Sequence, residues 1–270
     1  MVTIWGVVPT DHDQTRAFGV LRDIHDILGT TKSHFWPFSE TTGQAVRGLA
    51  TSDLVPSDET SGRNLEDEFT PIFELREPIV HAYTFTGDNS RHLVAADNAD
   101  YSYEGASEAF SGLIWAKPRE AGSALQTLMA KYDATVATEY SFHITSGDVL
   151  QLDLFDGVDG VTGDLRYTSV LGTVDQHELR CYGFSYPGAE ADVSFYKDGA
   201  LMDVIAKVET GSYVNMDDTA AKFFVGGRDS GGAPTDLLDG LLAPPIITGK
   251  NLSVTDHRDL YHLMRSLVGV

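Results

Sequence analysis

The sequence has very little positive charge. It contains 7 Lys and 12 Arg against 27 Asp and 13 Glu, which gives the 270-residue chain a formal net charge of −21 and a pI near 4.6. A surface this negative repels the phosphate backbone of nucleic acids and the headgroups of anionic lipids. We therefore expect neither nucleic acid nor a membrane as a partner.

Paired cysteines and long apolar runs are also missing. Cys181 is the single cysteine, so the chain cannot form an intrachain disulfide. No stretch reaches the apolar length of a membrane span. The first residues have neither the basic region nor the apolar run of a signal peptide. These absences predict a soluble protein that is made in the cytoplasm.

The excess of acid does not mean that the chain is unfolded. Hydrophobic residues make up 42% of the sequence and aromatic residues 10%, which is enough for a sizeable core. Many Asp and few Lys are typical of proteins that work in concentrated salt, where ions screen the repulsion between carboxylates. A halophilic source is one hypothesis, and an ordinary acidic domain is the alternative.

A helix is expected at each end of the chain. Apolar side chains at three- and four-residue spacing predict the first helix over residues 11–28, with Gly29 as its stop. The apolar stripe fits either a partner protein or the core of the chain itself. The candidate docking residues are Phe18, Leu21, Ile24 and Leu28. A start signal at residues 253–256 precedes the second helix.

Between these helices the pattern favours β-strands. From about residue 79, short runs rich in β-branched and aromatic residues alternate with turn residues, and apolar side chains recur at every second position. Residues 146–148 predict one hairpin turn, and Asp198-Gly199 predicts another. Trp36 and Trp115 fall in strand patterns and are expected in the core. Many short strands separated by turns predict an all-β sandwich.

A series of small motifs in the same order resembles the laminin-G-like, concanavalin A-like jelly rolls. The motifs are the aromatic run 34–40, the strands 83–88 and 93–94, Phe110 to Pro118 with its W-x-K-P ending, the pair 128–132 and 139–144, the hairpin 193–199, and the late strands 224–227 and 238–240. The resemblance covers roughly residues 33–266. One departure is Pro244-Pro245, and we expect this double proline to end strand pairing there.

The fold class that the resemblance implies is all-β, a concanavalin A-like (laminin-G-like) jelly-roll sandwich with short N- and C-terminal helices. It divides the chain into an N-terminal segment with a docking helix, residues 1–32, and a jelly-roll domain, residues 33–270. Related jelly-roll glucanases carry the run Glu-x-Asp-x-x-Glu on one strand, and this run is missing here. No zinc motif and no nucleotide-binding loop occurs either. We therefore expect no enzyme.

Calcium and a glycan are the two candidate ligands. Some relatives in the resembled family bind calcium at a loop rim, and calcium prefers several carboxylate and carbonyl oxygens. The positions here that fall near such a rim are Asp133, Glu139, Asp217 and Asp218. A sugar needs an exposed ring on which to stack, beside polar groups. The loop tyrosines that could stack are Tyr101, Tyr103, Tyr167, Tyr186 and Tyr213.

The sequence leaves two functions open. Jelly rolls of this type resemble accessory proteins of tailed viruses, which predicts a non-enzymatic virion structural protein. It would decorate a capsid or belong to a tail, bind other virion proteins, form a homo-oligomer, and be made in the host cytoplasm without a signal peptide. The alternative is a lectin-like module that recognises a host-surface glycan, with calcium as its candidate cofactor.

Overall fold

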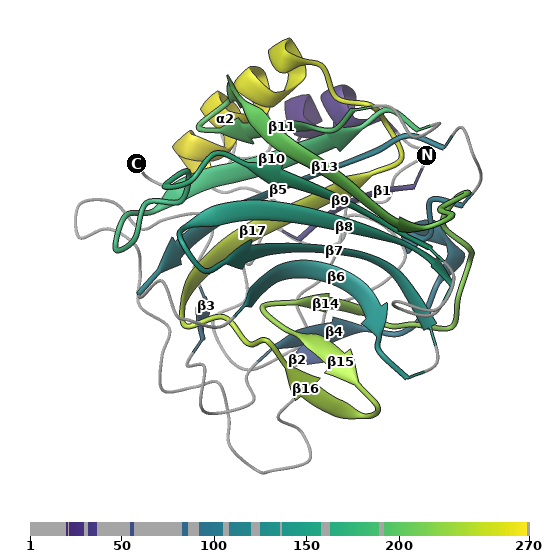
Figure 1. Ribbon diagram of the computed structural model, residues 1–270. Helices are drawn as coiled ribbons and strands as arrows, with labels where there is room; N and C mark the ends of the chain where they lie inside the picture. Colours follow the sequence, from purple (N-terminus) through teal and green to yellow (C-terminus); the bar gives the residue numbers. More distant parts are fainter. Residues whose placement is uncertain are drawn as a thin grey trace.

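The computed structural model contains two packed β-sheets with helices on one outer side (Figure 1). The residues that it describes are 20, 22–29, 32–36, 55–56, 83–85, 92–104, 108–119, 125–135, 137–157, 163–188 and 192–268. Within these ranges the architecture confirms the expected all-β sandwich with short helices near both ends of the chain. No helix in these ranges is both long enough and apolar enough to span a membrane.

We call one sheet the back sheet. Its seven described strands are β1 (Ser33–Phe35), β17 (Gly240–Thr248), β5 (Phe110–Pro118), β10 (Arg180–Tyr186), β11 (Ser194–Lys197) and β12 (Ala200–Met202) in spatial order, with β3 (Tyr83–Phe85) also paired to β17. All of its pairs are antiparallel. Strands from both ends of the sequence therefore lie side by side in this sheet.

We call the other sheet the front sheet, because it faces the viewer in Figure 1. Its spatial order in the described residues is β13 (Val204–Gly211), β9 (Gly163–Ser169), β8 (Val149–Gly157), β7 (Ala137–Thr145), β6 (Gln126–Asp133), β14 (Phe223–Val225), β4 (Leu93–Ala95) and β2 (Val55–Pro56). The hairpin of β15 (Arg228–Ser230) and β16 (Ala233–Thr235) joins it beside β6. A short 3₁₀ turn, η3 (Ala99–Tyr101), follows β4.

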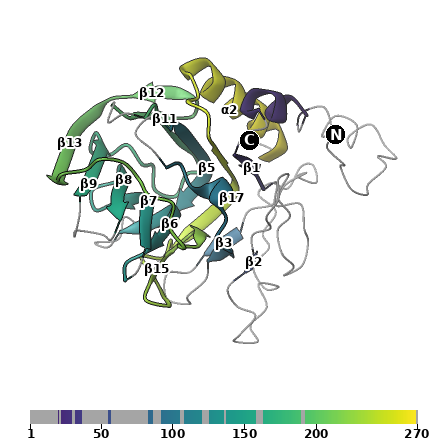
Figure 2. The ribbon, with the colours of Figure 1, turned by 90° about the vertical axis from the view of Figure 1, so that its right-hand side faces the viewer.

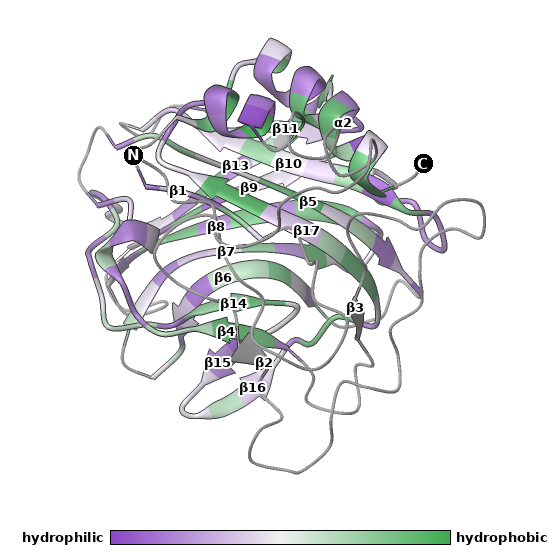
Figure 3. Ribbon diagram, turned by 180° about the vertical axis from the view of Figure 1, so that it is seen from behind, coloured by the Kyte–Doolittle hydropathy of each residue, from purple (hydrophilic) through white to green (hydrophobic). Residues whose placement is uncertain are grey.

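The side view shows three layers (Figure 2). The front sheet forms one outer layer, the back sheet lies in the middle, and α2 (Val254–Val268) lies on the far side with the helix at residues 22–28. Seen from behind, the middle layer shows hydrophobic stretches along β5 and β17, whereas the helices carry residues of both kinds (Figure 3). The helices therefore cover one face of the sandwich.

Each sheet contributes side chains to the main core between them. Trp36 and Phe110 meet side chains of the front sheet there, such as Phe142 and Leu152. A second apolar cluster lies between the back sheet and the helices and includes Trp115. The expectation that Trp36 and Trp115 are core residues is confirmed, since both are fully buried.

The expected turns and helix ends are confirmed where the structure describes them. Gly147 and Asp148 adopt positive φ between β7 and β8, and Asp198 and Gly199 do so between β11 and β12. This is the backbone that a primed hairpin turn requires. Gly29, also with positive φ, follows the helix at residues 22–28. The part of that predicted helix before residue 20 lies outside the described residues.

The prediction for Pro244-Pro245 is wrong. β17 does not end there but runs from Gly240 to Thr248, between β5 and β1. Its pairing shifts between Ala243 and Ile246, so the two prolines face a single residue of β5. A bulge of this kind removes residues from the hydrogen-bond ladder without ending the strand, and proline has no N–H to lose there.

Candidate functional site

A row of polar side chains crosses the outer face of the front sheet. Ser141 on β7 lies opposite Asp153 on β8, which lies opposite Arg166 on β9, which lies opposite Val208 on β13. Residues next to Asp153 in the strand, such as Leu152, belong to the core between the sheets. Because side chains alternate along a strand, the row points away from that core.

Asp153 is the centre of this row. Its carboxylate accepts hydrogen bonds from Gln151 Nε2 at 2.9 and 3.0 Å and from Arg166 Nε at 2.8 Å. Asp153 is almost completely buried, whereas 48% of the Arg166 side chain is exposed. The carboxylate therefore holds a guanidinium that reaches the surface at β9. We call Ser141, His143, Gln151, Asp153 and Arg166 the outer polar cluster.

His143 lies beside Asp153 but makes no hydrogen bond to it. Its Nε2 is 3.8 Å from Asp153 Oδ2 and has no hydrogen-bond partner, while its Nδ1 lies 3.0 Å from Ser141 Oγ. Burial lowers the pKa of His143 to about 4, and the nearby Asp153 only partly opposes this shift. The imidazole is therefore neutral at neutral pH and leaves one buried polar atom unsatisfied.

The outer polar cluster contains Ser, His and Asp, but its geometry does not favour nucleophilic catalysis. Ser141 and His143 are fully buried, so a substrate cannot reach the hydroxyl. A catalytic serine needs an accessible oxygen next to a basic nitrogen and donors for the developing oxyanion. The arrangement is better suited to hold polar groups of a ligand at its exposed end, Arg166.

The sequence contains a signal for this cluster that the predicted sites did not include. Polar side chains alternate with apolar ones at Ser141 and His143 before the turn, and at Gln151 and Asp153 after it. A hairpin turn at residues 146–148 sets 141 opposite 153 and 143 opposite 151, which is the observed register. The four side chains could have been placed together from the turn alone. Arg166 could not, because a longer connection precedes β9.

A second polar group surrounds Lys131, whose side chain is fully buried. Its Nζ lies 2.9 Å from Asp97 Oδ1, 2.6 Å from Glu139 Oε1 and 2.7 Å from the carbonyl oxygen of Thr219. Glu139 Oε1 also accepts bonds from Thr219 N and Oγ1. Burial raises the pKa of Glu139, and the Lys131 ammonium and the Thr219 bonds oppose that shift. We call Lys131, Asp97, Glu139 and Thr219 the Lys131 cage.

The predicted calcium ligands do not form one site, and this prediction needs correction. Glu139 and Asp218 are brought together, since Ser102 Oγ lies 3.2 Å from a carboxylate oxygen of the first and 2.8 Å from one of the second. Asp133 instead accepts bonds from Thr135 and from Gly231 N, and Asp217 is exposed. The oxygens around Glu139 already hold the ammonium of Lys131. Across the described ranges, no group of three or more His, Cys, Asp or Glu could hold a metal ion.

The tyrosines predicted to stack on sugars also need correction. All five are buried in the core between the sheets, and they are Tyr101, Tyr103, Tyr167, Tyr186 and Tyr213. Tyr103 packs on Phe110 with ring centroids 4.7 Å apart, and Tyr101 packs on Phe223 at 5.1 Å. Rings in these positions present no face to a ligand. Their place near loops had suggested exposure, but aromatic side chains often bury their rings.

Two of the predicted docking residues pack inside the chain. Ile24 and Leu28 lie in the apolar cluster under α2, with Leu260 and Met264 of that helix. The docking role is therefore corrected for these two, whose apolar surface is already covered. Phe18 and Leu21 lie outside the described residues, and the division of the chain at residue 32 stays a prediction.

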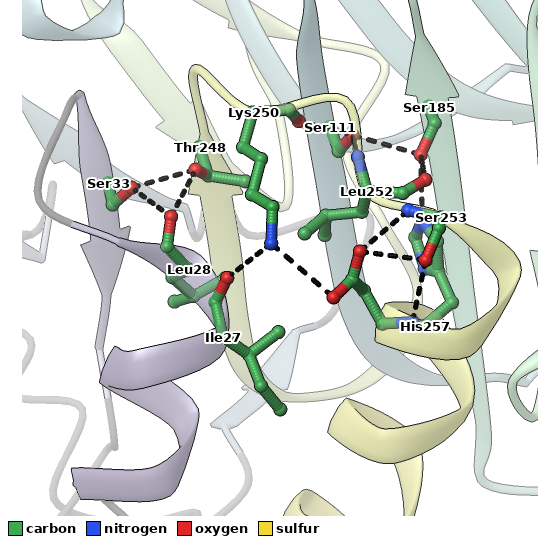
Figure 4. Close-up of polar contacts among 11 residues, drawn as sticks. Ile27, Leu28, Ser33, Ser111, Ser185, Thr248, Lys250, Leu252, Ser253 and His257 are labelled. Carbon is green, nitrogen blue, oxygen red and sulfur yellow. Dashed lines mark hydrogen bonds and ion pairs between the residues drawn. The ribbon is translucent and has the colours of Figure 1, made fainter.

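Polar contacts also hold the helix at residues 22–28 in place (Figure 4). Lys250 Nζ donates to the carbonyl oxygen of Ile27 at 2.7 Å, and Ser33 Oγ donates to that of Leu28 at 3.2 Å. Lys250 Nζ also lies 3.4 Å from Asp256 Oδ1, at the start of α2. The last carbonyls of the helix at residues 22–28 are thus capped by side chains that follow it or lie far along the chain.

Comparison with known proteins shows the fold. No family model and no curated protein matches the sequence. The sialidase of Trypanosoma rangeli in complex with 2,3-difluorosialic acid is similar over 94% of this chain and 39% of its own, with 13% identity and a TM-score of 0.54. The CBM40 of the Ruminococcus gnavus IT-sialidase, bound to α2,3-sialyllactose, is similar over 58% of this chain and 84% of its own, with 15% identity and a TM-score of 0.47. With its two sheets of mainly antiparallel strands, the chain is an all-β sandwich.

Proposed function

We propose that the protein is a non-catalytic carbohydrate-binding module that holds its glycan on the outer face of the front sheet. The observation that carries this proposal is the outer polar cluster, in which the buried Asp153 orients a guanidinium with about half of its side chain exposed. An exposed guanidinium held in one orientation suits the hydroxyl and carboxylate groups of a sugar. No helix of the described residues covers this face (Figure 2).

Solved structures with this fold support the choice of ligands to test. The Trypanosoma rangeli sialidase has been solved in complex with sialic acid, and its TM-score to this chain is 0.52. A carboxylated sugar could pair with the Arg166 guanidinium, whereas a neutral sugar would accept hydrogen bonds from it. The first panel should therefore contain both sialylated and neutral oligosaccharides.

The test is glycan binding by the wild type, Arg166→Ala and Arg258→Ala, measured on an array and by calorimetry. Arg258 is an exposed arginine on α2, on the opposite side of the sandwich, and it serves as the matched control. We expect Arg166→Ala to weaken binding at least about tenfold, with Arg258→Ala unchanged. No binding by the wild type, or equal binding by all three proteins, would refute the proposal.

Chelation of calcium gives an independent readout of the same proposal. The predicted calcium ligands do not converge, and Lys131 holds the oxygens around Glu139. We therefore expect glycan binding in EDTA to equal binding in calcium. A strict calcium requirement would contradict this view of the site and would restore the calcium-dependent lectin that the sequence suggested.

A structural role in a virion is the second candidate function. This role implies that the protein is located in the virion, as predicted from the sequence. What supports an assembly role is the edge strand β13, which exposes the apolar side chains of Val204 and Val208. The protein should then co-sediment with intact particles, and a portal or major capsid gene should lie beside its own. Free protein that never associates with particles would exclude this role.

A further inference from the structure

β13 is an unusually exposed edge of the sandwich. It is the outermost strand of the front sheet, and in the described residues it pairs only with β9. From Lys207 to Gly211 every residue is exposed. An uncovered strand edge presents unpaired N–H and C=O groups that can bind another strand.

β13 itself carries exposed apolar side chains. The described chain has six large hydrophobic residues with high exposure, namely Leu171, Leu201, Val204, Val208, Val214 and Val254. Val204 and Val208 belong to β13, while Leu201 and Val214 lie three residues before and after it. Leu171 follows Ser169, which pairs with Val204. Two of the six therefore belong to the edge strand itself, and exposed apolar residues on a strand edge favour an interaction surface.

The charges of β13 fit a second copy of the same strand. Lys207 lies opposite Tyr167 and Glu209 lies opposite Leu165, so both charged residues are on the side of the strand that faces the core. If two copies pair antiparallel about Val208, Lys207 of each copy lies opposite Glu209 of the other. Pairing centred one residue earlier or later would instead place Lys207 or Glu209 opposite itself, and like charges directly opposite are destabilising.

We propose that the protein forms a two-fold symmetric dimer through β13, with Val208 on the symmetry axis. The two front sheets then join into one continuous sheet, and each dimer contains two Lys207–Glu209 pairs. Charged edge strands often prevent association, but here the order of the signs matches self-pairing. The pairing bulge between Val204 and Ala206 lies at the start of the strand, away from this centre. The dimer does not depend on the proposed glycan site.

A charge exchange tests the dimer by analytical ultracentrifugation or light scattering at about 0.15 M NaCl. We expect the wild type to dimerise, and Lys207→Glu and Glu209→Lys each to raise the dissociation constant about tenfold or more. The double exchange Lys207→Glu/Glu209→Lys should return the dissociation constant of the dimer to about the wild-type value. Lys222→Glu, at an exposed lysine outside β13, is the control and should leave the dimer intact.

The two single variants also separate local pairing from overall charge. Lys207→Glu makes the chain more negative and Glu209→Lys makes it less negative, so general repulsion would shift dimerisation in opposite directions. If the Lys207–Glu209 pairs hold the dimer together, both single variants should weaken dimerisation. A monomeric wild type, a dimer unaffected by either exchange, or a double variant that folds by circular dichroism but stays monomeric would each overturn the proposal.

Discussion

At the scale of single residues, the Lys131 cage stands out because two of its charges, those of Lys131 and Glu139, are fully buried. The Lys131 ammonium and the Glu139 carboxylate lie 2.6 Å apart, and neither side chain is exposed. Desolvation of two ions costs several kcal/mol each, and their attraction offsets that cost only while both are present. The pair is therefore sensitive to the loss of one partner.

We expect Lys131→Met to lower the free energy of unfolding by about 3–5 kcal/mol, because it leaves Glu139 charged and buried without its partner. Lys131→Met/Glu139→Gln should recover much of this loss, since it removes both charges. Urea denaturation measures both variants, with the exposed Lys222→Met as the matched control. If the single and double variants lose the same free energy, the pair does not act as described.

His143 makes stability depend on pH. Its pKa is about 4 in the folded protein and near 6.5 when unfolded, so the unfolded chain binds a proton here that the folded chain does not. The free energy of unfolding should therefore fall as the pH drops from about 6.5 to 4, by up to about 1.4 kcal/mol per pH unit for this group. Burial also lowers the pKa of His34 and His257, which adds to the fall.

The variant His143→Gln isolates the contribution of this residue to the pH dependence of the unfolding free energy. Its unfolding free energy should fall less steeply than that of the wild type between pH 6.5 and 4, measured by denaturant unfolding. Above pH 7 the two curves should run parallel, since the imidazole is neutral in both states there. Parallel curves over the acidic range would show that His143 is not the group involved.

At the scale of elements, turns and helix ends were the features that could be predicted from the sequence. Asp198-Gly199 and residues 146–148 fix local backbone geometry, and Ser253 with Asp256 caps α2 through mutual hydrogen bonds. The burial of individual side chains was harder to predict, because it depends on how the two sheets pack against each other. The stacking tyrosines were misplaced for this reason, and so was the effect of Pro244-Pro245 on an interior strand.

Lys250 connects the two helical elements, and its loss should loosen the first one. We expect Lys250→Met to speed amide exchange over residues 22–29 and to lower the free energy of unfolding by about 1 kcal/mol, because the carbonyl of Ile27 loses a charged donor. Hydrogen–deuterium exchange measures the first effect. Arg258→Met, on the exposed side of α2, is the control, and equal protection in both variants would contradict the link.

At the scale of the whole molecule, the charge of −21 is not concentrated in one site. Acidic residues occupy loops and turns over the described surface, and those of the Lys131 cage and the outer polar cluster have basic partners. Other acids also pair with basic residues, such as Asp175 with Arg180 and Asp236 with Arg228. Because 40 acids face only 19 bases, the net negative charge still makes the surface repel itself through solvent. This distribution agrees with the hypothesis of a protein that works in concentrated salt, which stays a prediction.

Salt should therefore stabilise the protein. We expect the melting temperature to rise by several degrees between about 0.05 and 1 M NaCl, since ions screen the repulsion between exposed carboxylates. The effect should shrink near pH 4.6, where the net charge vanishes. Calorimetry at both pH values measures this, and a melting temperature independent of salt at pH 7 would remove the halophilic hypothesis.

The single thiol lies beneath the helical layer, and this gives the chain a built-in kinetic reporter. Cys181 on β10 is buried in the cluster that contains Ile24 and Leu260, and burial raises the pKa of its thiol. A thiol reagent can therefore react only while the helices lift from the back sheet. The rate at which the reagent labels Cys181 therefore measures how often the helices open. The labelling rate of urea-unfolded protein is the reference for a fully accessible thiol.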